Sequence, residues 1–137
     1  MRFDGRGLYN EHSSRVDADG DLRWIAASGC RGISRLEIDV AGESEPPTEA
    51  KFTVRLIFCD PDFGEAGKRQ FDVLVQSQPA FTKLDVAAEA GGRRQPLIKE
   101  LSGVAATDAL VVEFVAGEGD AGQPTPILSG IEVLRER

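Results

Sequence analysis

The stretch that decides the fold reads Phe52-Thr-Val-Arg-Leu-Ile-Phe58-Cys-Asp60-Pro-Asp62-Phe63-Gly64-Glu-Ala-Gly67-Lys-Arg-Gln-Phe71-Asp-Val-Leu-Val75. Large apolar residues occupy every second position in 52–58 and again in 71–75, a period that places them on one face of a β-strand. The segment between carries Pro61, Gly64 and Gly67, which are typical of turns because Pro fixes φ and Gly tolerates positive φ. The stretch therefore predicts two core strands joined by an acidic loop.

The rest of the chain repeats this pattern of short strands between turns. Further strands are predicted at 22–26, 33–40, 80–86, 95–101, 109–116 and 127–134, with turns at 28–32 and 77–79, one helical turn at 87–90 and exposed loops at 41–49 and 117–126. No long amphipathic helix is predicted. About eight short strands without such a helix indicate an all-β antiparallel sandwich or barrel.

Length and charge bound the domain count and the partners. At 137 residues, the chain is predicted to be a single domain over 1–137. A net charge of −7 argues against nucleic acid or an anionic membrane as partner, because both would repel it. No apolar run approaches the ~20 residues of a membrane span, and Met1–Gly7 lacks the hydrophobic core of a signal peptide.

The acidic loop offers candidate metal ligands. Asp60, Asp62 and Glu65 could share a calcium ion, since hard carboxylate oxygens within one loop suit it, although a solvated surface turn is the simpler reading. We therefore expect no cofactor. An acid–base pair is not expected here either, because nothing nearby in sequence supplies an apolar pocket or a counter-charge. The single histidine, His12, has no partner in sequence for a triad or a metal site.

The two cysteines do not reveal the redox compartment. Cys30 and Cys59 lack the CxxC spacing of zinc and thioredoxin-type sites. They are either two small buried thiols or, if their loops are adjacent, a disulfide.

Phe63 is the candidate ligand-binding aromatic. It lies at the tip of the acidic loop among hydrogen-bond acceptors, an arrangement that suits a sugar-binding loop and also occurs in ordinary β-hairpins. Its ring either faces a ligand or folds inward to cap the core.

Four segments, in order and at comparable spacing, carry a family resemblance. They are Thr53-Val-Arg-Leu-Ile-Phe58, Phe71-Asp-Val-Leu-Val-Gln76, Asp85-Val-Ala-Ala-Glu-Ala-Gly-Gly92 and Pro126-Ile-Leu-Ser-Gly-Ile-Glu-Val133. Together they resemble the malectin family, and most closely its domains appended to larger bacterial extracytoplasmic proteins. The similarity covers about two-thirds of the chain, from Lys51 onward. It implies a jelly-roll sandwich of the galactose-binding-domain type that binds carbohydrate, without catalysis, at loops on one edge.

The resemblance also implies which residues bind. Transferred position by position, the ligand-binding residues fall on Tyr9, Asp62, Phe63 and Asp120. A second family tyrosine falls near Ala27 or Ser28, where this chain has no aromatic, and Asp62 replaces one ring of an aromatic pair. Because ring stacking is a large share of carbohydrate affinity, these losses should weaken or redirect binding.

The implied partner is an oligosaccharide, with glucose-containing glycans suggested by the family. The implied setting is extracytoplasmic, with neighbouring domains of a larger protein. The alternative is a structural or protein-interaction domain that keeps the sandwich and has lost the sugar site.

Overall fold

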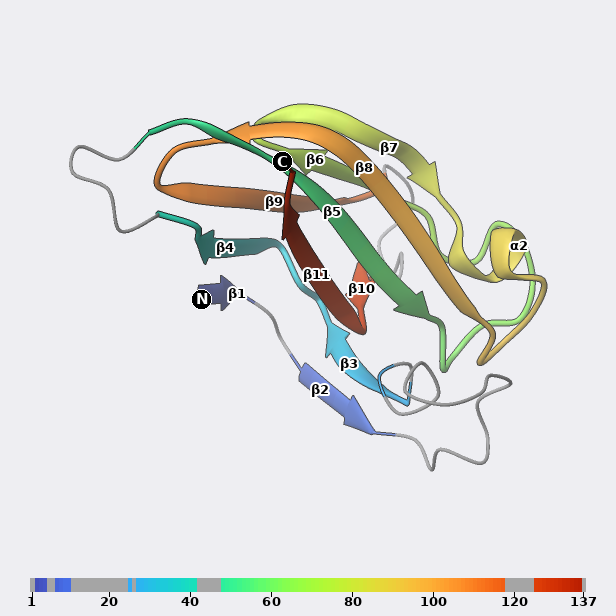
Figure 1. Ribbon diagram of the computed structural model, residues 1–137. Coiled ribbons are helices and arrows are strands. Elements are labelled where there is room, and N and C mark those ends of the chain that lie inside the picture. The colour runs from blue at the N-terminus through green and yellow to red at the C-terminus, as the bar shows by residue number, and fades with distance from the viewer. Residues whose placement is uncertain are drawn as a thin grey trace.

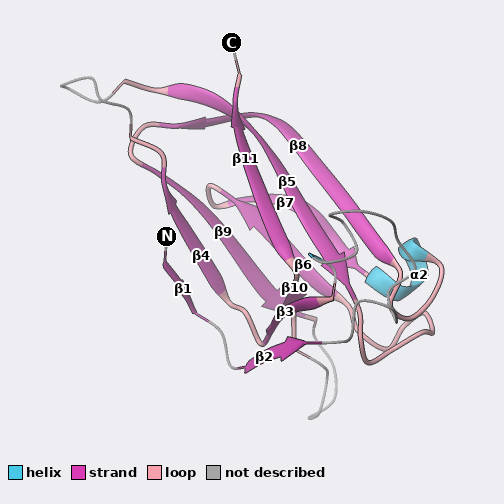
Figure 2. Ribbon diagram, turned by 60° about the horizontal axis from the view of Figure 1, so that its bottom comes forward, coloured by secondary structure: helices cyan, strands magenta, loops and turns pink. Residues whose placement is uncertain are grey.

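The strands pack as an antiparallel β-sandwich, which confirms the predicted fold class (Figures 1 and 2). This computed structural model describes residues 2–4, 7–10, 25, 27–41, 48–117 and 125–136, and within 2–10 it describes the backbone alone. Among these residues, no helix is long and apolar enough to cross a membrane.

One layer is a five-stranded sheet. Its strands, in spatial order, are β1 (Arg2–Asp4), β4 (Arg35–Asp39), β9 (Ala109–Ala116), β6 (Phe71–Val75) and β7 (Gln78–Leu84). Every pairing in it is antiparallel.

The second layer consists of two three-stranded sheets that follow one another. The first contains β11 (Gly130–Arg135), β5 (Ala50–Cys59) and β8 (Pro96–Ala106), and the second contains β10 (Ile127–Leu128), β3 (Ser28–Arg31) and β2 (Gly7–Asn10). Only Ser129 separates β10 from β11, and its N–H donates to the carbonyl of Ile57 at 2.9 Å. The chain therefore passes directly from one sheet to the other along β5.

The core lies between the layers and contains the residues that the alternating pattern predicts. Phe58 on β5 and Phe71 on β6 are fully buried, with ring centroids 5.8 Å apart. Phe114 on β9 packs on Phe71 at 6.5 Å. Tilted ring pairs at this separation are favourable beyond the area that they bury, so the predicted hairpin strands form the centre of the sandwich.

Two predictions about turns and strands were wrong. The segment 28–32 was read as a turn from its Gly and Ser content, but Ser28–Arg31 form strand β3, because Cys30 pairs with Leu8 on one side and with Leu128 on the other. Such tertiary pairing overrides local turn propensity. Ile25, inside the predicted strand 22–26, is helical, and the other residues of that segment lie outside the described residues.

The turn between β6 and β7 comes one residue earlier than predicted. Gln76 and Ser77 form it, with φ of 52° and 63°. Positive φ at both central residues is the type I′ geometry that matches the twist of a tight hairpin. The Gln78-Pro79 pair, expected in the turn, already belongs to β7.

The predicted helical turn is α2 (Val86–Ala90). Asp85 caps its start by accepting from the N–H of Ala88 at 3.1 Å, and Gly91, with φ of 91°, ends it. The other oxygen of Asp85 accepts from the N–H of Gly67 at 2.6 Å. One buried carboxylate thus ties the helix to the acidic loop.

Cys30 and Cys59 are both buried, and neither forms a disulfide. Of the two alternatives that the sequence left open, the structure therefore agrees with two small buried thiols and not with a disulfide.

Candidate functional site

The acidic loop, residues 60–70, joins β5 to β6 at one end of the sandwich, and it is pinned by distant parts of the chain. The N–H of Arg94 donates to the carbonyl of Asp60 at 2.8 Å, and the N–H of Gly117 donates to that of Gln70 at 3.1 Å. A Cβ on Gly117 would lie 2.8 Å from the same Gln70 oxygen, so this close approach requires glycine. With the Asp85 bond to Gly67, the loop is held along its length.

Asp60 organises the loop from inside. It is fully buried, and its Oδ1 accepts hydrogen bonds from the backbone N–H groups of Asp62 at 2.9 Å and Phe63 at 3.0 Å. The same oxygen accepts from Nη1 of Arg69 at 2.8 Å. The reading of the loop carboxylates as solvated turn residues is therefore wrong for Asp60, because this carboxylate is buried and paired with the buried Arg69.

Asp62 lies on the surface of the loop, between two arginines. Nε and Nη2 of Arg31 donate to its two oxygens, each at 2.8 Å, and Nη2 of Arg69 donates to Oδ2 at 3.1 Å. The two hydrogen bonds from Arg31, with the one from Arg69, hold the pKa of Asp62 below its ordinary value. The expectation that nothing near these carboxylates supplies a counter-charge was wrong, because Arg69 in the same loop and Arg31 on β3 both donate to Asp62.

The arginines also bear on the calcium alternative. The contacts above direct oxygens of Asp60 and Asp62 toward guanidinium groups. Within the described ranges, no group of three His, Cys, Asp or Glu residues is arranged to hold a metal ion.

Phe63 lies between the two expected positions for its ring. It is neither fully buried nor fully exposed, and Cζ of Arg69 lies over the ring, 5.0 Å from its centroid. This is cation–π distance. One face of the ring is therefore covered by Arg69, and part of the side chain remains open to solvent.

Tyr9 lies in β2, where its backbone pairs with Gly29 of β3, while its side chain is outside the description. Arg31, two residues further along β3, binds Asp62 on the acidic loop. Arg31 therefore links β3 to the acidic loop, and β3 is paired with β2 beside it (Figure 1).

Asp120 lies outside the described residues. The described residues that flank Asp120 are anchored, since Gly117 contacts Gln70 and the carbonyl of Pro126 accepts from the N–H of Gly32 at 2.8 Å.

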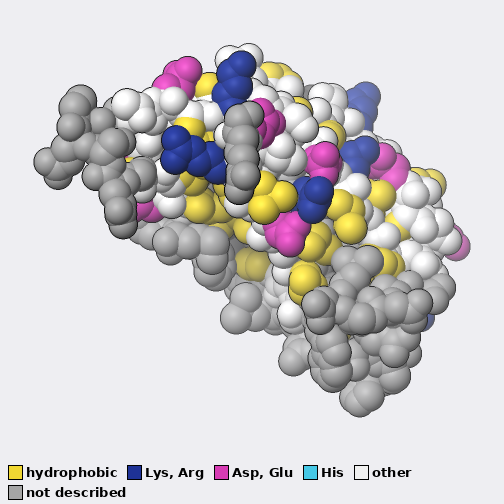
Figure 3. Space-filling model, viewed as in Figure 1, with side chains coloured by type: hydrophobic (Ala, Val, Ile, Leu, Met, Phe, Trp, Pro, Cys, Tyr) yellow, Lys and Arg dark blue, Asp and Glu magenta, His cyan; other side chains and the backbone are white. Residues whose placement is uncertain are grey.

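The face formed by β11, β5 and β8 has a mixed character (Figure 3). Apolar side chains, among them Ile98 and Leu134, are interspersed with charges of both signs. Arg55 on β5 pairs with Glu100 on β8 and with Glu132 on β11. Exposed pairs of this kind contribute little to stability, and no single-signed patch dominates the described part of this face.

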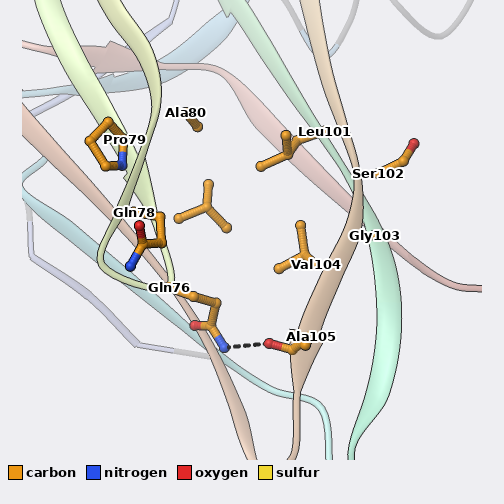
Figure 4. Close-up of a pocket in the computed structure, with 10 residues that line it drawn as sticks. Gln76, Gln78, Pro79, Ala80, Leu101, Ser102, Gly103, Val104 and Ala105 are labelled. Carbon is orange, nitrogen blue, oxygen red and sulfur yellow. Dashed lines mark hydrogen bonds between the residues drawn. The ribbon is translucent and has the colours of Figure 1, made fainter.

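A hollow of about 370 Å³ lies between the edge strands β7 and β8 (Figure 4). Its walls are mostly apolar, from Val75, Leu101 and Val104, and the side chain of Gln76 reaches across its end to the carbonyl of Ala105. The first residue of β8 that lines the hollow, Leu101, is five residues after Pro96, where the strand begins near the acidic loop. The hollow is therefore roughly 16 Å from that end of the strand. No residue predicted to bind ligand lines it.

The two-layer antiparallel sandwich, with the acidic loop held at one end, is the fold that the family resemblance implies. The chain belongs to the malectin domain family, whose model matches residues 44–126. Members of this family are non-catalytic domains that bind carbohydrates, and they occur within larger multi-domain proteins.

Solved structures share the fold at low sequence identity. A calcium-binding mutant of beta-glucuronidase 2 from Bacteroides uniformis superposes with a TM-score of 0.76 at 14% identity, over 98% of this chain and 14% of that one. The ANXUR1 extracellular domain from Arabidopsis thaliana gives 0.75 at 13% identity, over 97% and 40%. The chain thus spans less than half the length of these structures, and no curated protein sequence matches it.

Proposed function

We propose that this domain is a non-catalytic carbohydrate-binding module that binds an oligosaccharide at the acidic loop. The sugar stacks on the open part of Phe63, and the carboxylates of Asp62 and Asp120 accept hydrogen bonds from its hydroxyls, with Tyr9 at the same end of the sandwich. The observation that carries the proposal is a partly exposed ring on a loop pinned at several points. A rigid platform reduces the ordering cost of binding.

The chemistry of Asp62 fits a supporting role. A carboxylate has about four lone-pair positions, and Arg31 and Arg69 occupy three of them. One position remains for a sugar hydroxyl, and a charge-assisted bond to it is stronger than a neutral one. Asp62 can therefore add one hydrogen bond to a sugar whose apolar face stacks on Phe63.

The same contacts favour a second candidate function. Asp62 is largely occupied within the protein, and Ala27, near the position of a family tyrosine, is buried with 4% of its surface exposed. A domain of this fold that mediates structural or protein contacts, with no sugar site, fits both observations. The two functions differ in whether any glycan binds at the acidic loop.

Isothermal titration against a panel of neutral and acidic oligosaccharides, glucose-containing ones included, tests the proposal. We expect a binder in the panel, and an affinity loss of about tenfold for Phe63→Ala, since one stacking ring contributes on the order of 1 kcal/mol or more. The matched control is Phe81→Ala on β7, because Phe81 is also partly buried beneath a cation, Lys99, at 5.2 Å. If no glycan in the panel gives a binding heat, or if the two variants lose equal affinity, the proposal is contradicted and the interaction domain is favoured.

A further inference from the structure

The buried ion pair of Asp60 and Arg69 contacts both residues of the Asp62-Phe63 dipeptide. Asp60 is fully buried and Arg69 is 4% exposed, and they pair at 2.8 Å. Oδ1 of Asp60 accepts from the backbone amides of both dipeptide residues. Arg69 reaches both of their side chains, donating to Asp62 and covering Phe63. Two residues therefore fix the backbone and the side chains of the dipeptide together.

Stability alone does not account for this pair. Oδ2 of Asp60 and Nε of Arg69 are buried without a hydrogen-bond partner among the described residues. A buried ion pair offsets its desolvation only when its remaining polar atoms are satisfied, and neutral replacements of such pairs are often as stable or more so. An arrangement that is poor for the fold and specific for one dipeptide indicates a role in that dipeptide's geometry.

We propose that Asp60 and Arg69 are positioning residues that present Asp62 and Phe63 to the saccharide, an inference that rests on the proposed function. Arg69 covers one face of the Phe63 ring, so the ligand stacks on the other face only. The Asp60 carboxylate holds the loop in this conformation before the ligand arrives, which removes an ordering cost from binding.

The test is a neutral replacement of the pair, Asp60→Asn/Arg69→Met. Asn keeps an oxygen that can accept from the two backbone amides, and Met keeps an apolar stem without the guanidinium. We expect a folded domain with a urea midpoint close to the wild-type value, and a loss of about tenfold in affinity for a glycan that the wild-type domain binds. Removing the exposed β4 pair with Arg35→Met/Glu37→Gln is the control, and it should change neither quantity.

Hydrogen exchange without ligand separates this inference from the proposed function. The amides of Asp62 and Phe63 should exchange at least tenfold faster in the double variant, because the side chain at position 60 is no longer held by Arg69. If the wild-type domain binds no glycan, the proposed function fails, and unchanged exchange at these two amides overturns the positioning role separately.

A double variant that folds and keeps wild-type glycan affinity overturns the inference. If the double variant does not fold, its glycan affinity cannot be measured. In that event Arg69→Lys provides the second measurement, because it keeps a charge for Asp60 but has no planar group to cover Phe63 and bind Asp62 together. Wild-type affinity in this variant would overturn the inference as well.

Discussion

The side chain of Gln76 joins the β6–β7 turn to the neighbouring strands, and its removal should be measurable in stability. Its Nε2 donates to the carbonyls of Ala105 at 3.1 Å and Ala109 at 3.2 Å, and its Oε1 accepts from the N–H of Val111 at 2.8 Å. The amide thus completes the hydrogen bonding of β9 where β6 has ended. Each such bond contributes about 0.5–1.5 kcal/mol net.

Three bonds, one of them exposed, give an expected loss of about 2 kcal/mol for Gln76→Ala. With an m-value of about 1.5 kcal/mol/M, the urea midpoint should fall by roughly 1.3 M. The substitution adds no backbone strain, because Gln and Ala both have a Cβ at this φ of 52°. The control is Gln78→Ala, an exposed residue beside the same turn, which should stay within about 0.5 kcal/mol of wild type. Equal midpoints for both variants would refute the bridging role.

Three further predictions concern charge, backbone strain and close approach. Arg31 lowers the pKa of Asp62 from its ordinary value of 3.8, so ionised Asp62 stabilises the fold above about pH 3.8, and this contribution is lost as the pH falls through the lower folded-state pKa. The difference in urea midpoint between wild type and Asp62→Asn should therefore shrink in that acid range; a difference that stays constant there contradicts it. Ser77→Gly should raise stability by about 0.5–1 kcal/mol in thermal unfolding, because glycine adopts a φ of 63° without the strain that a Cβ causes. An unchanged Tm would contradict this prediction. Gly117→Ala should cost about 1–3 kcal/mol in urea, since its Cβ would crowd the Gln70 carbonyl, and a neutral effect would show that the loop can shift.

The central strands were predictable from sequence because their signal is local. The alternation in 52–58 follows from the pleat of one strand packed on one core, and burial in β5 alternates from Phe52 to Leu56, beyond which Ile57 is buried as well. Strand β3 was missed because its Gly and Ser content indicates a turn, while its pairing depends on β2 and β10, which are distant in sequence.

The site was only partly accessible from sequence for the same reason. The acidic residues and Phe63 are adjacent in the chain, so their cluster was visible. Arg31 lies on another strand, and the Arg69 side chain is buried where it donates to Asp60, at the other end of the loop. No periodicity or spacing encodes such contacts, since they exist only once the two layers have packed. The only available signal was composition, namely an arginine at the end of an acidic loop.

The most direct test follows the ring itself. In a domain labelled with ¹³C-phenylalanine, titration with a bound oligosaccharide should shift the aromatic signals of Phe63, because a stacked sugar changes the ring's surroundings, and should leave Phe81 unmoved. Shifts confined to residues that line the hollow between β7 and β8, with Phe63 unchanged, would contradict the account.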